Sequence, residues 1–183
     1  MSEANAKFLD TFSAWLRSLG EDSAALGAVL EVEDCPQVAR EAVAGGLNYL
    51  FKSLDLIPDG IDDIGYLDDA FVLRVACELA AREDLSRTPP AAVQTVERLA
   101  ADAAIVREFL EKDYERLEAY VRGLRRGAAR GRTVTDIVGD AQVRSEFLAD
   151  LNGFARGYEP PTFTREEKNL VKLRAFFDAK LPR

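Results

Sequence analysis

Apolar residues recur at intervals of three and four along most of this chain, and no segment shows sustained alternation of apolar and polar residues. Such spacing puts apolar side chains on one face of an α-helix, whereas alternation would indicate strands. The chain of 183 residues is long enough to bury a hydrophobic core without disulfides or metals. The sequence therefore predicts an all-α protein, a compact bundle of roughly six to eight helices.

Glycine, proline and capping residues predict where several helices begin and end. Gly20 is placed to end the first helix, and Pro36 to begin a helix that continues to about Lys52. A break is expected near Lys112-Asp113, and Thr164 with Glu167 forms a capping box that starts the last helix. The predicted buried positions of the helix after Pro36 are Val38, Val43, Leu47, Leu50 and Phe51.

Two further features concern packing and domain organisation. Gly45-Gly46, in the middle of the helix after Pro36, favours close packing on another helix, with close approach by a ligand as the alternative. We expect a helical bundle over residues 1–158 that contains a helical hairpin at about 38–84. Residues 159–183 supply a C-terminal helix packed on the same domain.

The segment 55–69, DLIPDGIDDIGYLDD, interrupts the helical pattern with six aspartates and no basic residue. Pro58 lacks an amide hydrogen and pushes Ile57 toward extended backbone, so the segment is not the interior of a helix. We predict an ordered acidic connection over residues 53–67.

The residues in and around this connection resemble a known family. The resemblance rests on Tyr49-Leu50, on Asp55-Leu56-Ile57-Pro58-Asp59, and on Gly65-Tyr66-Leu67-Asp68-Asp69. This pattern resembles the YkvA-like family of bacterial domains of unknown function, over about residues 47–79. The resemblance implies a helical hairpin whose connection is held by the aspartates, with Pro58, Gly65 and Tyr66 as structural residues. It implies no reaction.

The aspartates have two interpretations. In the first, which we favour, they are structural: they cap helix starts and turns, each cap contributing about 1 kcal/mol, and pair with Lys52 or Arg74. In the second they bind a hard cation, because Mg²⁺, Mn²⁺ and Ca²⁺ prefer carboxylate oxygens. The candidate ligands are Asp55, Asp59, Asp62, Asp63, Asp68 and Asp69. Their spacing does not fit an EF-hand, and no cofactor is certain.

Residues 122–132, RGLRRGAARGR, form the one basic segment. Its arginines could bind phosphate, anionic lipid or an acidic partner through paired hydrogen bonds. The alternatives are a solvated helix end, which we favour, or docking on the acidic connection. The candidate anion-binding residues are Arg122, Arg125, Arg126, Arg130 and Arg132.

Composition excludes several classes of function. The chain has no histidine and only two cysteines, Cys35 and Cys77, which removes His-dependent nucleophile systems and structural zinc sites. The two thiols are expected to be core residues in a reducing compartment, so we expect a cytoplasmic protein. No apolar run is long enough to span a membrane, and the first residues do not resemble a signal peptide.

We expect a non-catalytic helical interaction or regulatory module whose partner is another protein or a second copy of the chain. One alternative is a divalent-metal-dependent enzyme or metal-binding protein that uses the acidic connection. Another is a peripheral binder of anionic lipid or phosphate. The net charge of −8 disfavours nucleic acid and also argues against contact with an anionic membrane.

Overall fold

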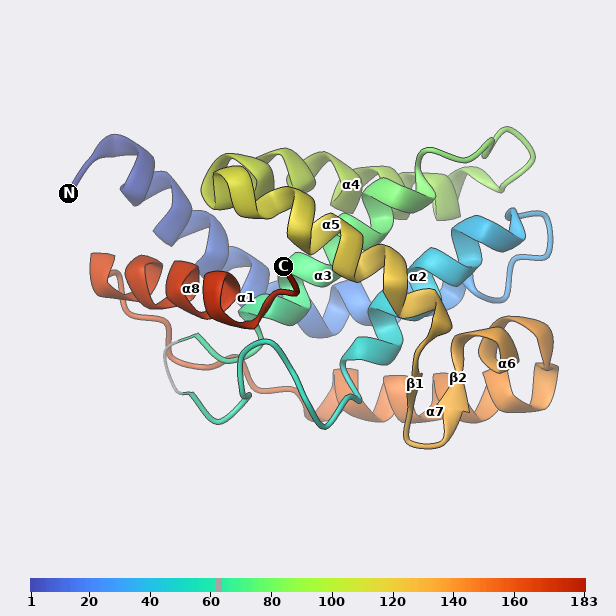
Figure 1. Cartoon of the computed structure of the whole chain (residues 1–183). Helices are drawn as coiled ribbons and strands as arrows, with labels where there is room; N and C mark the ends of the chain where they lie inside the picture. The colour runs from blue at the N-terminus through green and yellow to red at the C-terminus, as the bar shows by residue number, and fades with distance from the viewer. Residues whose placement is uncertain (62–63) are drawn as a thin grey trace.

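Helix α3 (Leu67–Ala80) lies at the centre of the computed structural model, which describes residues 1–61 and 64–183. All of its residues except Glu78 are buried, and it packs most extensively against α2 (Gln37–Tyr49) and α4 (Pro90–Leu110). Figure 1 shows α4 and α5 along one side of the bundle and α7 along the other. The remaining α-helices are α1 (Glu3–Val29), α5 (Tyr114–Gly123), α6 (Val134–Gly139), α7 (Ala141–Gly157) and α8 (Glu167–Lys180).

The predicted all-α class is confirmed. The described strands are a two-residue pair, β1 (Ala128–Ala129) and β2 (Arg132–Thr133), which form a small antiparallel hairpin between α5 and α6. A short 3₁₀ helix, η2 (Leu124–Arg126), precedes the hairpin. Among the described residues, no helix has both the length and the apolar composition needed to cross a membrane.

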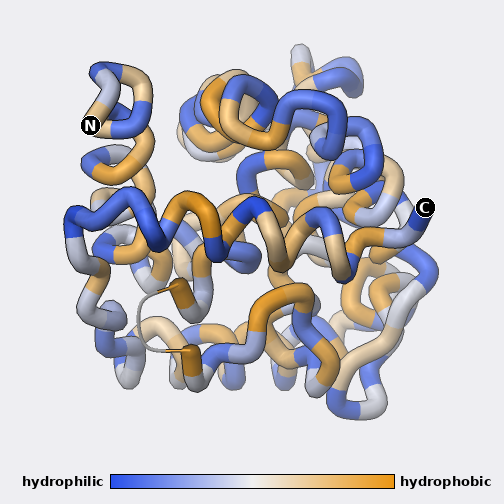
Figure 2. Tube along the Cα trace, turned by 60° about the vertical axis from the view of Figure 1, so that its left-hand side comes forward, coloured by the Kyte–Doolittle hydropathy of each residue, from blue (hydrophilic) through white to orange (hydrophobic). Residues whose placement is uncertain are grey.

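Aromatic side chains join the helices at the core. Phe12 of α1 lies 4.9 Å from Phe109 of α4 and 5.0 Å from Phe71 of α3, measured between ring centroids. The ring of Phe71 stacks on Phe177 of α8 at 5.2 Å. Burial of such rings contributes both apolar area and favourable edge-to-face contacts. Helix α8 therefore packs on the bundle, and Figure 2 shows it crossing the front of the molecule.

Two predicted helix boundaries are wrong. Helix α1 continues through Gly20 to Val29, because Gly20 is a packing position and not a helix end. A Cβ at Gly20 would lie 3.1 Å from the carbonyl oxygen of Ala155, so glycine allows α7 to approach α1 closely. The capping box at Thr164 is not formed; Thr164 instead accepts a hydrogen bond from the side chain of Asn169, and α8 begins only at Glu167.

Other boundaries agree with the sequence. The chain breaks between α4 and α5 through a 3₁₀ helix, η1 (Glu111–Asp113), where Glu111 has a positive φ of 51°. Helix α2 begins after Pro36 as expected, although it ends at Tyr49 rather than near Lys52. The connection between α2 and α3 is irregular, as Pro58 predicted.

The Gly45-Gly46 pair lies where α2 meets its neighbours, as the packing interpretation requires. A Cβ at Gly46 would lie 2.8 Å from the Cβ of Ala76 on α3, and one at Gly45 would lie 3.3 Å from Leu124. Replacing Gly46 by alanine should lower the free energy of unfolding by about 1–3 kcal/mol, because overlap with α3 outweighs the gain in helix propensity.

A matched control for this substitution is Gly153→Ala in α7, where an added Cβ meets nothing within 4 Å. That variant should gain up to about 1 kcal/mol from helix propensity alone. Urea denaturation of both variants measures the difference. A stabilised Gly46→Ala variant would contradict close packing at the α2–α3 contact.

Candidate functional site

The acidic connection is fastened to the bundle by Asp68, in the first turn of α3. The hydroxyl of Tyr49 donates a hydrogen bond of 2.5 Å to Asp68 Oδ2, and the amide of Ile57 donates one of 3.0 Å to the same oxygen. Tyr49 Oη in turn accepts a 2.7 Å hydrogen bond from the amide of Leu56. All four residues are buried. Asp68 and Tyr49 thus join the end of α2, the connection and the start of α3.

Four of the six predicted carboxylates act on one another electrostatically. Burial, and then the charges of Asp59 and Asp68, raises the pKa of Asp55 to about 7. Burial also raises the pKa of Asp59, and raises that of Asp68 to about 6 against the hydrogen bonds that lower it. Burial, followed by the charges of the other three, raises the pKa of Asp69 well above its usual range.

Some oxygen atoms of this cluster have no hydrogen-bond partner among the described residues. They are Asp55 Oδ1, Asp68 Oδ1 and Asp69 Oδ2. An unpaired buried carboxylate is costly when charged, and a proton relieves that cost. The raised pKa values follow from this situation.

The predicted cation site stays a prediction. Two of its six candidate ligands, Asp62 and Asp63, lie outside the described residues. Within residues 1–61 and 64–183, no group of three or more acidic or thiol side chains is placed to hold a metal ion. The Mg²⁺, Mn²⁺ or Ca²⁺ interpretation therefore gains no support from the part of the chain that is described.

The basic residues flanking the connection behave differently from one another. The charge of Lys52 acts to lower the pKa of Asp55, as the sequence suggested. Arg74 pairs with none of the connection's aspartates among the described residues, which corrects that part of the prediction for Asp55, Asp59, Asp68 and Asp69. Its side chain is directed instead to Asp22 and Asp102, on α1 and α4.

The motif residues of the connection occupy constrained backbone positions. The carbonyl oxygen of Pro58 accepts a hydrogen bond from the amide of Ile61 and closes a turn. A Cβ at Gly65 would lie 2.4 Å from the carbonyl oxygen of Asp59, so only glycine fits there. Tyr66 has a left-handed φ of 65° just before α3, and its ring packs 5.4 Å from that of Tyr158.

The raised pKa values predict an unusual dependence of stability on pH. Asp55, Asp68 and Asp69 have higher pKa values in the folded state than the ordinary 3.8, so between the two values the folded state binds more protons than the unfolded chain. The free energy of unfolding should therefore fall as pH rises from about 5 to about 8, by about 1–3 kcal/mol after allowance for solvent screening. Urea midpoints across this range measure the slope.

The control for the pH prediction is Asp69→Asn, which keeps the shape of the protonated side chain without its titration. This variant should match the wild type near pH 5 and exceed it in stability near pH 8. The carboxyl of Glu118 does not contribute to the change in stability between pH 5 and pH 8, because hydrogen bonds from Arg82 and Arg122 lower its pKa to about 2. A wild-type midpoint that increases with pH would refute the prediction.

The five arginines of the basic segment do not form one patch. Arg130 stacks on Phe51, with its guanidinium 4.7 Å from the ring centroid, and Arg132 forms an ion pair of 2.5 Å with Asp150. The side chains of Arg122 and Arg125 line a groove on the other side of the segment. None of the ion pairs found among the described residues joins these arginines to the aspartates of the connection.

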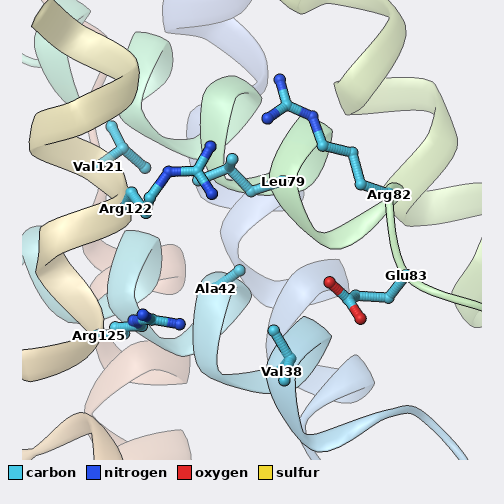
Figure 3. Close-up of a pocket in the computed structure, with 8 residues that line it drawn as sticks. All are labelled: Val38, Ala42, Leu79, Arg82, Glu83, Val121, Arg122 and Arg125. Carbon is cyan, nitrogen blue, oxygen red and sulfur yellow. The ribbon is translucent and has the colours of Figure 1, made fainter.

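This groove, which we call the α2–α3–α5 groove, is open to solvent and has a cavity volume of about 80 Å³. Its floor is apolar and its rim is charged (Figure 3). In Figure 3, Arg122 extends across the groove toward Leu79, while Arg82 and Glu83 lie on the opposite rim. The lining residues are Val38 and Ala42 of α2, Leu79 of α3, Arg82 and Glu83 just after α3, Val121 and Arg122 of α5, and Arg125 of η2.

Val38 shows where the sequence prediction of the core failed. Its position on the helix after Pro36 predicted burial, yet 47% of its surface is exposed. It lies in the first turn of α2 and lines the groove between α2 and α5, so about half of its surface stays open to solvent. An exposed valine beside the buried Leu79 and Val121 gives the groove an accessible apolar surface.

The charged side chains at the rim differ in how fully they are paired with opposite charges. Arg82 donates two hydrogen bonds to Glu118, of 3.1 and 2.8 Å, and Arg122 donates one of 2.7 Å to the same carboxylate. Glu118 therefore accepts hydrogen bonds from two arginines at once. Arg125 forms no ion pair among the described residues, and its positive charge remains available to a ligand. With Glu83 as the one acidic lining residue, the rim is positive although the whole chain is acidic.

Comparison with known proteins finds a family match for one segment of the chain. Residues 39–74 match a family model described as "Protein of unknown function (DUF1232)". The matched segment contains Tyr49, Asp55, Pro58, Gly65 and Asp68, and so includes the contacts that fasten the connection. No curated protein and no solved structure matches the chain.

Most of the groove was not predicted from the sequence. Arg122 and Arg125 were proposed as anion-binding residues, but Arg82, Glu83 and Leu79 were not proposed as site residues. No local pattern places the end of α3 beside the start of α2 and the end of α5, because their contact depends on tertiary packing. The one available signal was the basic segment itself.

Proposed function

We propose that this chain is a non-catalytic helical interaction module that binds another protein at the α2–α3–α5 groove. The observation that carries the proposal is an accessible apolar floor inside a charged rim. The cavity volume of about 80 Å³ is below the range of about 300–1,000 Å³ that is usual for small-molecule sites, so the groove suits a single side chain of a protein partner. Apolar contact at the centre with charge at the edge is the usual anatomy of a protein interface.

The exposure of Val38 supports docking rather than a purely structural role. The fold does not need an apolar side chain at a position that is 47% exposed, whereas a partner could bury it and gain favourable transfer free energy. The buried Leu79 and Val121 extend the apolar surface beneath it. Together they offer a small anchor site between three helices.

The acidic connection has a supporting role in this proposal. Asp68 and Tyr49 fix the end of α2 against the start of α3, and these two helices supply two walls of the groove. We also propose that the matched segment is a YkvA-like hairpin, since its D-L-I-P-D and G-Y-L-D-D residues make those contacts. A cytoplasmic location is part of the proposal, supported by two buried free thiols, Cys35 and Cys77.

Selection from a displayed library of short random peptides tests the proposal. The wild type, Val38→Glu and Val171→Glu serve as baits; Val171 is 66% exposed on α8, away from the groove, and is the matched control. We expect the wild type and Val171→Glu to enrich a common set of peptides that Val38→Glu does not retain. No enriched set, or equal enrichment by Val38→Glu, would overturn the proposed docking function.

A further inference from the structure

We infer that the α2–α3–α5 groove recognises an acidic peptide segment of its partner, with an apolar side chain on the floor and carboxylates at Arg122 and Arg125. This inference rests on the proposed function and names the chemistry of the partner. It assigns a role to the two arginines of the basic segment that line this groove.

The positive rim selects the charge of the ligand. Arg125 has no carboxylate of its own among the described residues, and Arg122 shares Glu118 with Arg82. A guanidinium that lacks a full partner gains a charge-assisted hydrogen bond when a carboxylate enters. Arg125 is therefore the strongest candidate for the first contact, and Arg122 for the second.

The apolar floor selects a peptide over a bare anion. Inorganic phosphate would satisfy the arginines but would leave Val38 and Leu79 without a favourable contact. An acidic segment that carries one leucine or phenylalanine satisfies both surfaces, because its side chain fills the space above the floor. Recognition of acidic motifs by arginine clusters is a recurrent mode of peptide binding.

Elsewhere on the molecule, the negative charge of the chain would repel an acidic peptide. The chain has a net charge of −8, so acidic peptides are repelled on average and basic peptides are attracted. A preference for acidic peptides must therefore come from a local positive site. This makes the charge preference a specific test of the groove.

Three displayed peptide pools provide the experiment. Each pool has a central leucine or phenylalanine, and the flanking residues are drawn from Asp, Glu, Gly and Ser, from Asn, Gln, Gly and Ser, or from Lys, Arg, Gly and Ser. The full chain is the bait, as wild type, Arg125→Gln and Arg126→Gln. Arg126 is the exposed neighbour that does not line the groove, so it removes the same charge from outside the site.

We expect wild type to retain the acidic pool about tenfold better than the neutral pool, in line with one or two charge-assisted contacts. Arg125→Gln should lose most of this preference and Arg126→Gln should keep it. Retention of the neutral pool should be the same for all three baits. High salt should weaken the acidic preference, because the rim is open to solvent.

The outcomes separate the inference from the function on which it rests. Equal or better retention of the neutral or basic pool by the wild type, lost when Val38→Glu is run as a fourth bait, would overturn the acidic partner and leave the docking function intact. No retention of any pool would count against both. A wild type that sediments as a dimer, with Val38→Glu monomeric, would show that a second copy occupies the groove and would overturn the inference.

Discussion

Replacing Arg74 by alanine should lower the free energy of unfolding by about 3–5 kcal/mol, because it breaks a buried ion-pair network and leaves a cavity between the helices. The side chain of Arg74 is 1% exposed and connects three helices. Its Nη2 lies 3.4 Å from Asp22 Oδ2 of α1, and its Nε lies 3.1 Å from Asp102 Oδ2 of α4. The guanidinium also stacks 4.0 Å from the ring centroid of Trp15, so the substitution loses packing as well as charge.

A matched control for Arg74→Ala is Arg98→Ala. Arg98 also forms an ion pair with Asp22, at 2.7 Å, but its side chain is 56% exposed. Its loss leaves Asp22 paired with Arg74, so we expect a cost of about 1 kcal/mol or less. Urea denaturation of the two variants measures the contrast. Equal losses would show that Arg74 is no more important to the fold than a surface ion pair.

Replacing Tyr49 by phenylalanine should lower the free energy of unfolding by about 2–4 kcal/mol, because the lost hydroxyl leaves a buried amide unpaired and removes one of the two hydrogen bonds to Asp68 Oδ2. The amide of Leu56 loses its acceptor, and Asp68 Oδ2 loses the 2.5 Å hydrogen bond from the hydroxyl. Both groups lie where water does not replace the lost contact. The connection should also become more accessible to hydrogen exchange at Leu56 and Ile57.

The control for Tyr49→Phe is Tyr120→Phe. The ring of Tyr120 packs 6.2 Å from that of Tyr49, and its hydroxyl accepts a hydrogen bond only from Lys52 among the described residues. Lys52 can turn to solvent when this acceptor is lost, so we expect a cost of about 1 kcal/mol or less. If Tyr49→Phe is as stable as Tyr120→Phe, the buried hydroxyl does not hold the connection.

Local sequence signals were sufficient to predict the helical class and the irregular acidic connection. Helical spacing and Pro58 act through neighbours in the chain, so they can be interpreted without the tertiary structure. The same holds for the break near Lys112-Asp113. Gly20 was misassigned because a glycine that ends a helix and a glycine that admits another helix have the same local signature. Only the approach of Ala155, which is distant in the sequence, separates the two cases.

The candidate sites were harder to predict from the sequence, because they depend more on tertiary contacts. The six aspartates were predicted to form one candidate site, because they lie together within residues 55–69. The partners of Arg74 were not predicted, since Asp22 and Asp102 come from helices far away in the chain. The groove joins three such segments, and the exposure of Val38 depends on a gap that no local pattern encodes.

The most direct test of the account is a map of amide chemical-shift changes when the most strongly retained acidic peptide is added to the isotope-labelled chain. We predict that the largest changes occur at Val38, Leu79, Val121 and Arg125, around the α2–α3–α5 groove. Leu54 is an internal comparison, because it is 85% exposed on the acidic connection and lies outside the groove. Changes centred on Leu54, or spread without relation to the groove, would contradict the proposal that this chain binds its partner between α2, α3 and α5.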